Sequence, residues 1–156
     1  MTGNPMNNTE IYETDFLCWI EQQTTLLRSK RFMDLDCVHL IEELEDMGRE
    51  QKVALQSLLR QILIHLLKLQ DSSSVEPRIH WVEEMTEWRD QVQTRLEATP
   101  SLKHYLHELF DKAWLQARRS AVKSLQAYEE SVQVPRTCPY TVEQTLDHDF
   151  SPLRRY

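Results

Sequence analysis

The sequence predicts an all-α protein: a single-domain helical bundle of four main helices, with a long central second helix and a short C-terminal helical segment. Only two glycines and six prolines occur in 156 residues, and a sheet-rich fold would need more turn residues than that. Apolar residues also recur at intervals of three and four along most of the chain, which is the period of a helix packed on one side. We expect a disordered N-terminus over residues 1–10, the helical domain over 11–150 and a tail over 151–156.

The first long helix is predicted to begin at Thr14 or Asp15, since either side chain caps a helix N-terminus well. The polar residues 29–31 end it. Its expected apolar face consists of Phe16, Trp19, Ile20, Gln23, Leu26 and Leu27.

The second helix is predicted to begin after Asp36, which is a suitable N-cap. It ends at a polar loop over residues 71–74. Gly48 lies inside this helix, where it either bends the helix or lets a neighbouring helix approach closely. The expected buried stripe consists of Val38, Ile41, Leu44, Met47, Leu55, Leu58, Ile62, His65, Leu66 and Leu69.

The remaining helices are predicted from their starts and their apolar stripes. Pro77 suits the first turn of the third helix, and Pro100 after Thr99 suits the first turn of the fourth. Thr141 caps a last short helix over residues 142–146. The third helix is expected to bury Trp81, Val82, Met85, Trp88, Val92 and Leu96, and the fourth Leu102, Leu106, Leu109, Ala113, Ala117, Ser120, Ala121 and Ser124.

Charge and cysteine content exclude several classes of protein. The formal net charge is −7, which argues against nucleic acid as a partner, because phosphates need a concentrated basic surface. Three cysteines without a CxxC motif argue against a disulfide framework or a zinc knuckle and favour a reducing cytoplasm. We find no signal peptide and no run of about 18 apolar residues, so we expect no membrane association.

Five groups of residues follow one another along the chain in a recognisable order. They are Tyr12, Glu13, Asp15, Phe16, Trp19, Gln23, Leu27 and Arg28; Arg31, Phe32, Leu35 and Asp36; Leu40, Glu42, Glu43, Glu45, Asp46, Met47, Gly48 and Arg49; His65, Leu66, Leu67, Lys68 and Gln70; and Cys138, Pro139, Tyr140, Thr141, Gln144, Leu146, Asp147 and Phe150. This ordered set resembles the DUF29 family of small bacterial proteins, which is abundant in cyanobacteria. The resemblance covers about residues 11 to 150 and implies an all-helical bundle without an assigned activity.

A first candidate site combines acids of the second helix with a histidine. Glu42 and Glu45 share a helix face, and His65 lies in the apolar stripe. Carboxylates with an imidazole can bind a divalent metal in a bundle core. The alternative is a solvated acidic face and a core histidine. In a straight helix Glu45 and His65 are about 30 Å apart, so a shared site requires a reversal at Gly48 or a second subunit.

A second candidate is the pair His104 and His107, whose spacing suits two metal ligands on one helix. The alternative is an exposed polar face. A third candidate is the basic segment with Trp114, Arg118 and Arg119, which suits an anion or an acidic partner helix. Intramolecular pairing is the alternative there.

These observations predict a non-enzymatic cytoplasmic interaction or scaffold module without a cofactor, binding a protein partner or itself as a homodimer. The sequence has no phosphate-binding glycine loop, nucleophile elbow or HExxH motif. Two alternatives stay open. One is a metal-binding or metal-dependent bundle protein that uses the acids of residues 42–46 with His65, or the pair His104 and His107. The other is a regulatory partner of a macromolecule through the basic stretch near Arg118.

Overall fold

The computed structural model confirms the all-α fold class. It describes residues 8–71, 78–127 and 134–152, and these residues form helices and no strand. The predicted loop at residues 72–74 and the start of the third helix at Pro77 lie outside them. The elements are α1 (Asn8–Thr14), α2 (Phe16–Arg28), the short 3-10 helix η1 (Phe32–Asp34), α3 (Cys37–Asp71), α4 (Arg78–Ala98), the 3-10 helix η2 (Pro100–Tyr105), α5 (Leu106–Ala127) and α6 (Val142–Leu146).

The helix starts follow the predicted caps closely. Asp15 caps α2 by accepting a hydrogen bond from the backbone N–H of Cys18. Asp36 precedes α3, and its carboxylate accepts from the backbone N–H of His39. Thr141 forms a complete capping box with Gln144 at the start of α6. The predicted domain boundary at residue 11 lies within α1, which already begins at Asn8.

The chain divides into two compact units, Met1–Arg49 and Glu50–Tyr156. We call them the N-terminal unit and the C-terminal unit. The N-terminal unit holds α1, α2, η1 and the first turns of α3, and the C-terminal unit holds the rest of α3 with α4, α5 and α6. The same helix, α3, therefore serves two separate sets of contacts.

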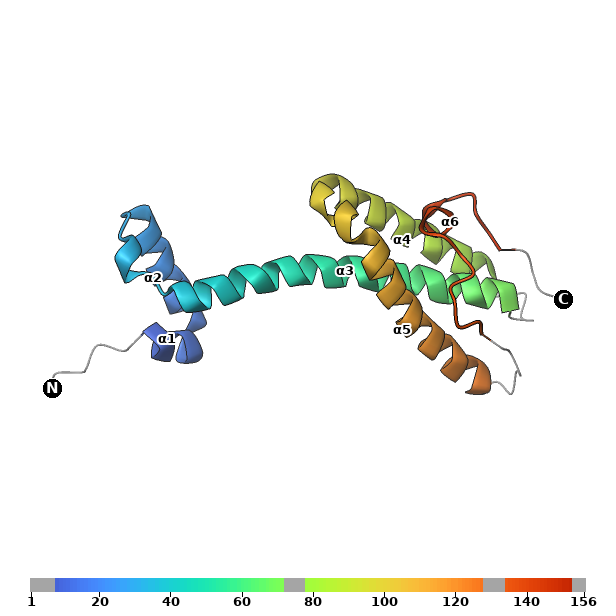
Figure 1. Cartoon of the computed structure of the whole chain (residues 1–156), viewed down its shortest axis with the longest axis horizontal. Helices are drawn as coiled ribbons and strands as arrows, with labels where there is room; N and C mark the ends of the chain where they lie inside the picture. Colours follow the sequence, from blue (N-terminus) through green and yellow to red (C-terminus); the bar gives the residue numbers. More distant parts are fainter. Residues whose placement is uncertain (1–7, 72–77, 128–133, 153–156) are drawn as a thin grey trace. The chain divides into compact units, whose positions relative to one another are not determined.

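Helix α3 is a single helix from Cys37 to Asp71, and Gly48 lies inside it. Figure 1 draws α3 as one continuous ribbon. A Cβ atom added at Gly48 would have nothing within 4 Å among the described residues. The structure therefore gives no break at this position and no closely approaching helix within the described part of the chain.

The C-terminal unit contains a single large core around the second half of α3. This half is rich in leucine and isoleucine on nearly all sides, which is typical of a helix surrounded by others. Helices α4 and α5 lie beside it (Figure 1). The buried side chains of this core include Leu55, Leu59, Ile62, Leu63, Leu66, Leu67, Leu69, Met85, Val92, Leu102, Leu109, Phe110, Ala113, Trp114, Ala117 and Ala121. Of the predicted core positions of α4, Met85, Val92 and Leu96 are buried, and Trp81 and Trp88 are half-buried against this core. Val82 was also predicted to be buried, but it is 43% exposed. The predicted Leu102, Leu109, Ala113, Ala117 and Ala121 are buried.

Arg89 of α4 binds the C-terminal segment over residues 145–150. This side chain is only 2% exposed, and sequence periodicity did not predict it to be buried. Its guanidinium group donates to three backbone carbonyls, those of Thr145, His148 and Phe150, at 2.9, 3.4 and 3.2 Å. His148 also pairs with Asp90 of α4 at 2.8 Å. The buried guanidinium group of Arg89 and the pair of His148 with Asp90 therefore hold α6 and the residues after it against α4.

The predicted burial of the first half of α3 is wrong. Val38, Ile41, Leu44 and Met47 are 55–66% exposed. These four residues lie three positions apart and run along one ridge of α3. The contacts of the N-terminal unit instead use Asp36, which precedes α3, and the side of α3 that carries His39 and Glu43. Helical period identifies an apolar face and does not reveal whether another part of the same chain covers it.

Candidate interaction surface

A polar cluster centred on Asp36 holds α2 against the start of α3. The indole N–H of Trp19 donates to Asp36 Oδ2 at 3.1 Å, and His39 Nδ1 lies 2.7 Å from the same oxygen. The amide oxygen of Gln23 accepts from the backbone N–H of Asp36 at 2.9 Å. Burial raises the pKa of Asp36, but the hydrogen bonds from His39 and Trp19 outweigh it and hold the pKa below its ordinary value.

Tyr12 attaches α1 to the same cluster. Its hydroxyl donates to Glu43 at 2.6 Å, and its ring stacks on the His39 ring with centroids 4.0 Å apart. The hydrogen bond to the Glu43 carboxylate raises the pKa of Tyr12 to about 12. The cluster thus fixes which sides of α2 and α3 face inward in the N-terminal unit.

Two apolar surfaces remain on the outward sides of these helices. On α2, Phe16, Ile20 and Leu27 are 45, 39 and 46% exposed. Leu27 follows Ile20 by seven residues and Phe16 by eleven, and both intervals return to nearly the same side of a helix. We call these three residues the α2 stripe. On α3, exposed apolar side chains follow one another every three residues, which makes them neighbours on the helix surface. We call this the α3 ridge: Val38, Ile41, Leu44 and Met47.

The two units differ sharply in how they use apolar side chains. Among the described residues of the N-terminal unit, only Trp19 and Leu26 are buried hydrophobic side chains. The exposed large ones there are Phe16, Leu17, Ile20, Leu27, Phe32, Met33, Val38, Ile41, Leu44 and Met47. In the C-terminal unit the proportion is reversed, since most large apolar side chains belong to the core. The N-terminal unit therefore presents an apolar surface.

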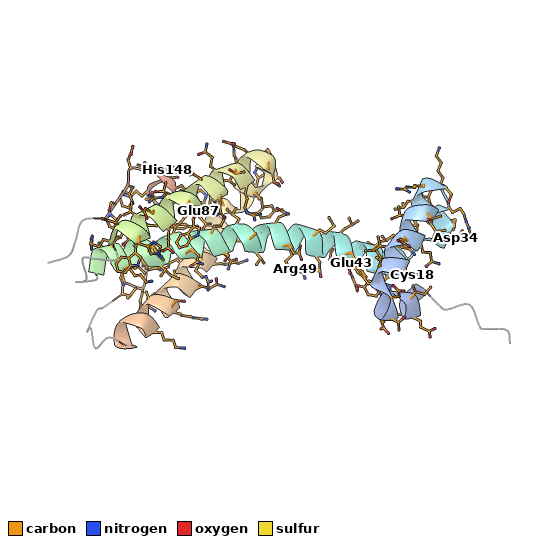
Figure 2. All side chains as sticks on the ribbon, turned by 180° about the vertical axis from the view of Figure 1, so that it is seen from behind. Cys18, Asp34, Glu43, Arg49, Glu87 and His148 are labelled. Atoms are coloured by element: carbon orange, nitrogen blue, oxygen red, sulfur yellow. The ribbon has the colours of Figure 1, made fainter. Side chains whose placement is uncertain are left out.

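An open hollow of about 830 Å³ lies beside α2 and η1. Figure 2 labels two of its lining residues, Cys18 and Asp34. Its lining also includes Gln22, whose buried amide oxygen has no hydrogen-bond partner within the described ranges. The hollow is lined by charged as well as apolar side chains, so it suits a polar contact at the edge of an interface.

The residues of the first predicted metal site belong to different units of the chain. Glu42 and Glu45 are exposed on the first half of α3, while His65 is buried in the C-terminal unit. Instead, His65 Nε2 lies 2.7 Å from Glu84 Oε2 of α4.

His65 has the environment of a core residue. Its ring meets the rings of Trp81 and Trp88 edge-on, with centroids 6.3 and 4.8 Å away. Burial lowers the pKa of His65, against the opposing hydrogen bond to Glu84. Its Nδ1 atom is buried without a partner in the described part of the chain. The predicted alternative, a core histidine bonded to a neighbour, matches this geometry.

The second predicted pair lies at the junction of two helices. His104 belongs to η2 and His107 to the first turn of α5, and both are exposed. Glu108 pairs with Lys112, and this contact lowers the pKa of Glu108. Over residues 8–71, 78–127 and 134–152, no group of three or more histidine, cysteine or acidic side chains is arranged to hold a metal ion.

The basic segment of α5 binds the chain's own backbone. Trp114 is buried, and its indole N–H donates to the carbonyl of Arg136 at 3.0 Å. Arg118 donates to the carbonyls of Pro135 and Val134 at 2.9 and 3.4 Å. Arg119 is exposed. Two of the three side chains predicted for an anion or partner surface therefore hold the segment that follows residue 133.

The fold and these contacts define a small all-helical protein with an apolar outer surface on its N-terminal unit. Comparison with family models matches residues 11–151 to the domain of unknown function DUF29. The chain belongs to the DUF29 family. Neither the curated proteins nor the solved structures contain a match. Among the residues that the structure describes, no helix is long and apolar enough to cross a bilayer.

The residues that carried the family resemblance largely make internal contacts. Tyr12, Trp19, Gln23, Asp36 and Glu43 form the polar cluster of the N-terminal unit. Their order in the motifs was visible in the sequence, but their mutual contacts were not. In the C-terminal unit, the hydroxyl of Tyr140 donates to Gln70, which joins the last two motifs. Sequence reasoning also missed Arg89, which shares the buried side of α4 with Met85, Val92 and Leu96 but carries a charge. It missed Glu84 because the partner of this side chain, His65, lies on another helix.

Proposed function

We propose that this protein is a non-enzymatic cytoplasmic interaction module whose binding surface is formed by the α2 stripe and the α3 ridge. One observation carries the proposal: seven large apolar side chains on these two helices are 39–66% exposed, although other sides of the same helices are packed. Isolated exposed apolar residues are ordinary, but a contiguous group marks a site where another molecule binds.

The energetics favour a partner for this surface. Complete burial of one aliphatic or phenylalanine side chain contributes about 1.5–3 kcal/mol. The free energy gained by covering seven half-exposed side chains is therefore similar in size to the free-energy cost of association, which is about 4–15 kcal/mol. Neighbouring members of the ridge lie three residues apart, which is a spacing that anchors use when a helix binds another helix or a groove.

The chemistry of the polar residues also supports a binding module. Glu42 and Glu45 are exposed, His65 is engaged by Glu84, and Trp114 and Arg118 bind backbone carbonyls. A divalent metal at these residues stays a prediction without a structural observation in its favour. The cysteines are free, and Cys18 and Cys37 are exposed, which suits a reducing compartment.

The test compares two variants of the full chain. Ile41→Glu with Leu44→Glu places charges on the α3 ridge, and Leu115→Glu places one charge at a similarly exposed position of α5. We expect the first variant to lose every stable association of the protein, a second copy included, in chemical cross-linking followed by mass spectrometry. Leu115→Glu should retain those associations. Unchanged associations in the ridge variant would refute the proposed surface.

A further inference from the structure

We infer that the occupant of this surface is a second copy of the same chain, with the α2 stripe of each copy packed antiparallel on the α3 ridge of the other. This inference rests on the proposed function, because it uses the same surface. Three observations on the N-terminal unit support it: the exposed area, the arrangement of charges and the presence of two matching apolar surfaces on one chain.

The exposed area fits a dimer of standard size. With roughly 100 Å² of apolar surface for each fully exposed side chain, the stripe and the ridge together expose about 400 Å² per chain. A standard interface buries about 800 Å² per partner, of which about 60% is apolar. The two surfaces of one chain are therefore about sufficient for the apolar part of such an interface.

One charged pair on α2 is complementary to one charged pair on α3. Glu21 and Arg28 lie seven residues apart on α2, and Glu42 and Arg49 lie seven residues apart on α3. Seven residues are nearly two turns, so each pair lies along one side of its helix with about 10 Å between its charges. Antiparallel packing brings Arg28 opposite Glu42 and Glu21 opposite Arg49, whereas parallel packing brings like charges together.

These charged side chains are available for such contacts. Arg28, Glu21 and Glu42 are exposed and form no ion pair within the described residues. Arg49 pairs with Asp46, but both side chains are more than half exposed. An exposed pair of this kind contributes little stability and exchanges partners easily.

A two-fold dimer of this kind uses both surfaces of each chain. In a symmetric dimer the same patch serves both copies, so each contact of a stripe with a ridge occurs twice. The side of α2 that carries Trp19, Gln23 and Leu26 stays on its own chain, and the stripe is left for the partner. The interface would then consist of four helices, one α2 and one α3 from each copy.

The experiment is a charge-reversal cycle on the full chain, with sedimentation equilibrium over about 1–100 μM protein in low salt. We expect the wild type to be a dimer, and Arg28→Glu or Glu42→Arg alone to raise the dimer Kd about tenfold or more. The chain carrying both substitutions should recover dimerisation, because the negative charge at position 28 of one copy then faces the positive charge at position 42 of the other. Arg119→Glu, an exposed reversal on α5, should leave the Kd unchanged.

The outcomes separate this inference from the proposed function. A dimer that is indifferent to both single reversals, or a double variant that does not recover, overturns the antiparallel pairing. A wild type that stays monomeric through the whole concentration range overturns the second copy as occupant. In that case the ridge variant Ile41→Glu with Leu44→Glu still decides the proposed function, since a different protein partner would be lost in it.

Discussion

Buried polar side chains in this protein mainly organise backbone and helices. Asp36 joins Trp19, Gln23 and His39, and Arg89 gathers three carbonyls at the end of α6. Each of these contacts satisfies groups that would be costly to bury alone. The same residue types could have been assigned to a catalytic or metal site by type alone, so the partner of each atom decides its role.

His65 provides a prediction at the residue scale. Burial lowers its folded-state pKa below the unfolded value of about 6.5. The unfolded chain therefore binds the proton more readily, and stability falls as pH decreases below about 6.5. Through this group, the free energy of unfolding of the wild type should fall by at most about 1.4 kcal/mol per pH unit between pH 7 and 5. We expect this contribution to be absent in His65→Gln. Urea unfolding followed by circular dichroism measures it.

The control for this prediction is His107→Gln, at an exposed position of α5. It should keep the pH dependence of the wild type. An equal pH dependence in His65→Gln and wild type would show that other groups dominate acid sensitivity.

At the scale of elements, α3 is one helix with two kinds of surface. Its first half has a polar inner side and an apolar outer ridge, whereas its second half is buried on nearly all sides. Gly48 lies near the change and keeps helical geometry. Since nothing in the described residues packs against this position, only the intrinsic helix preference of the residue matters in the single chain.

Gly48→Ala should therefore stabilise the protein. Alanine favours a helix interior over glycine by about 0.5–1 kcal/mol, and there is space for its methyl group. Chemical denaturation at low protein concentration measures the change. Gln51→Ala, at an exposed position of the same helix, should change stability by only a few tenths of a kcal/mol. A lower stability of Gly48→Ala would mean that another segment contacts this side of α3.

At the scale of the whole molecule, the two units differ in the number of buried side chains that support them. The C-terminal unit has a core of leucines, tryptophan and small residues, and the N-terminal unit has Trp19 and Leu26 with a polar cluster. Small units with few buried side chains are marginally stable without additional contacts. An interface on the N-terminal unit would therefore provide burial that the unit does not obtain from its own residues.

Hydrogen exchange should show this difference within α3. Under conditions where the protein is monomeric, we expect amides of residues 38–47 to exchange about tenfold or more faster than those of residues 55–69. Both stretches have the same helical hydrogen bonds, so the difference reports the packing around them. Mass spectrometry of peptic peptides gives the rates. Equal protection in both stretches would contradict the weak support of the N-terminal unit.

The sequence by itself determined the helices and most of their ends. Asp15, Asp36 and Thr141 cap helices through local hydrogen bonds, and the leucine-rich half of α3 had to be a core element because of its composition. Only the tertiary structure decided which apolar faces were covered and which polar residues met. The pairing of His65 with Glu84, the burial of Arg89 and the exposure of Ile41 and Leu44 depend on contacts between distant segments. Helical periodicity reflects local geometry, and it does not specify which surface lies opposite a given face.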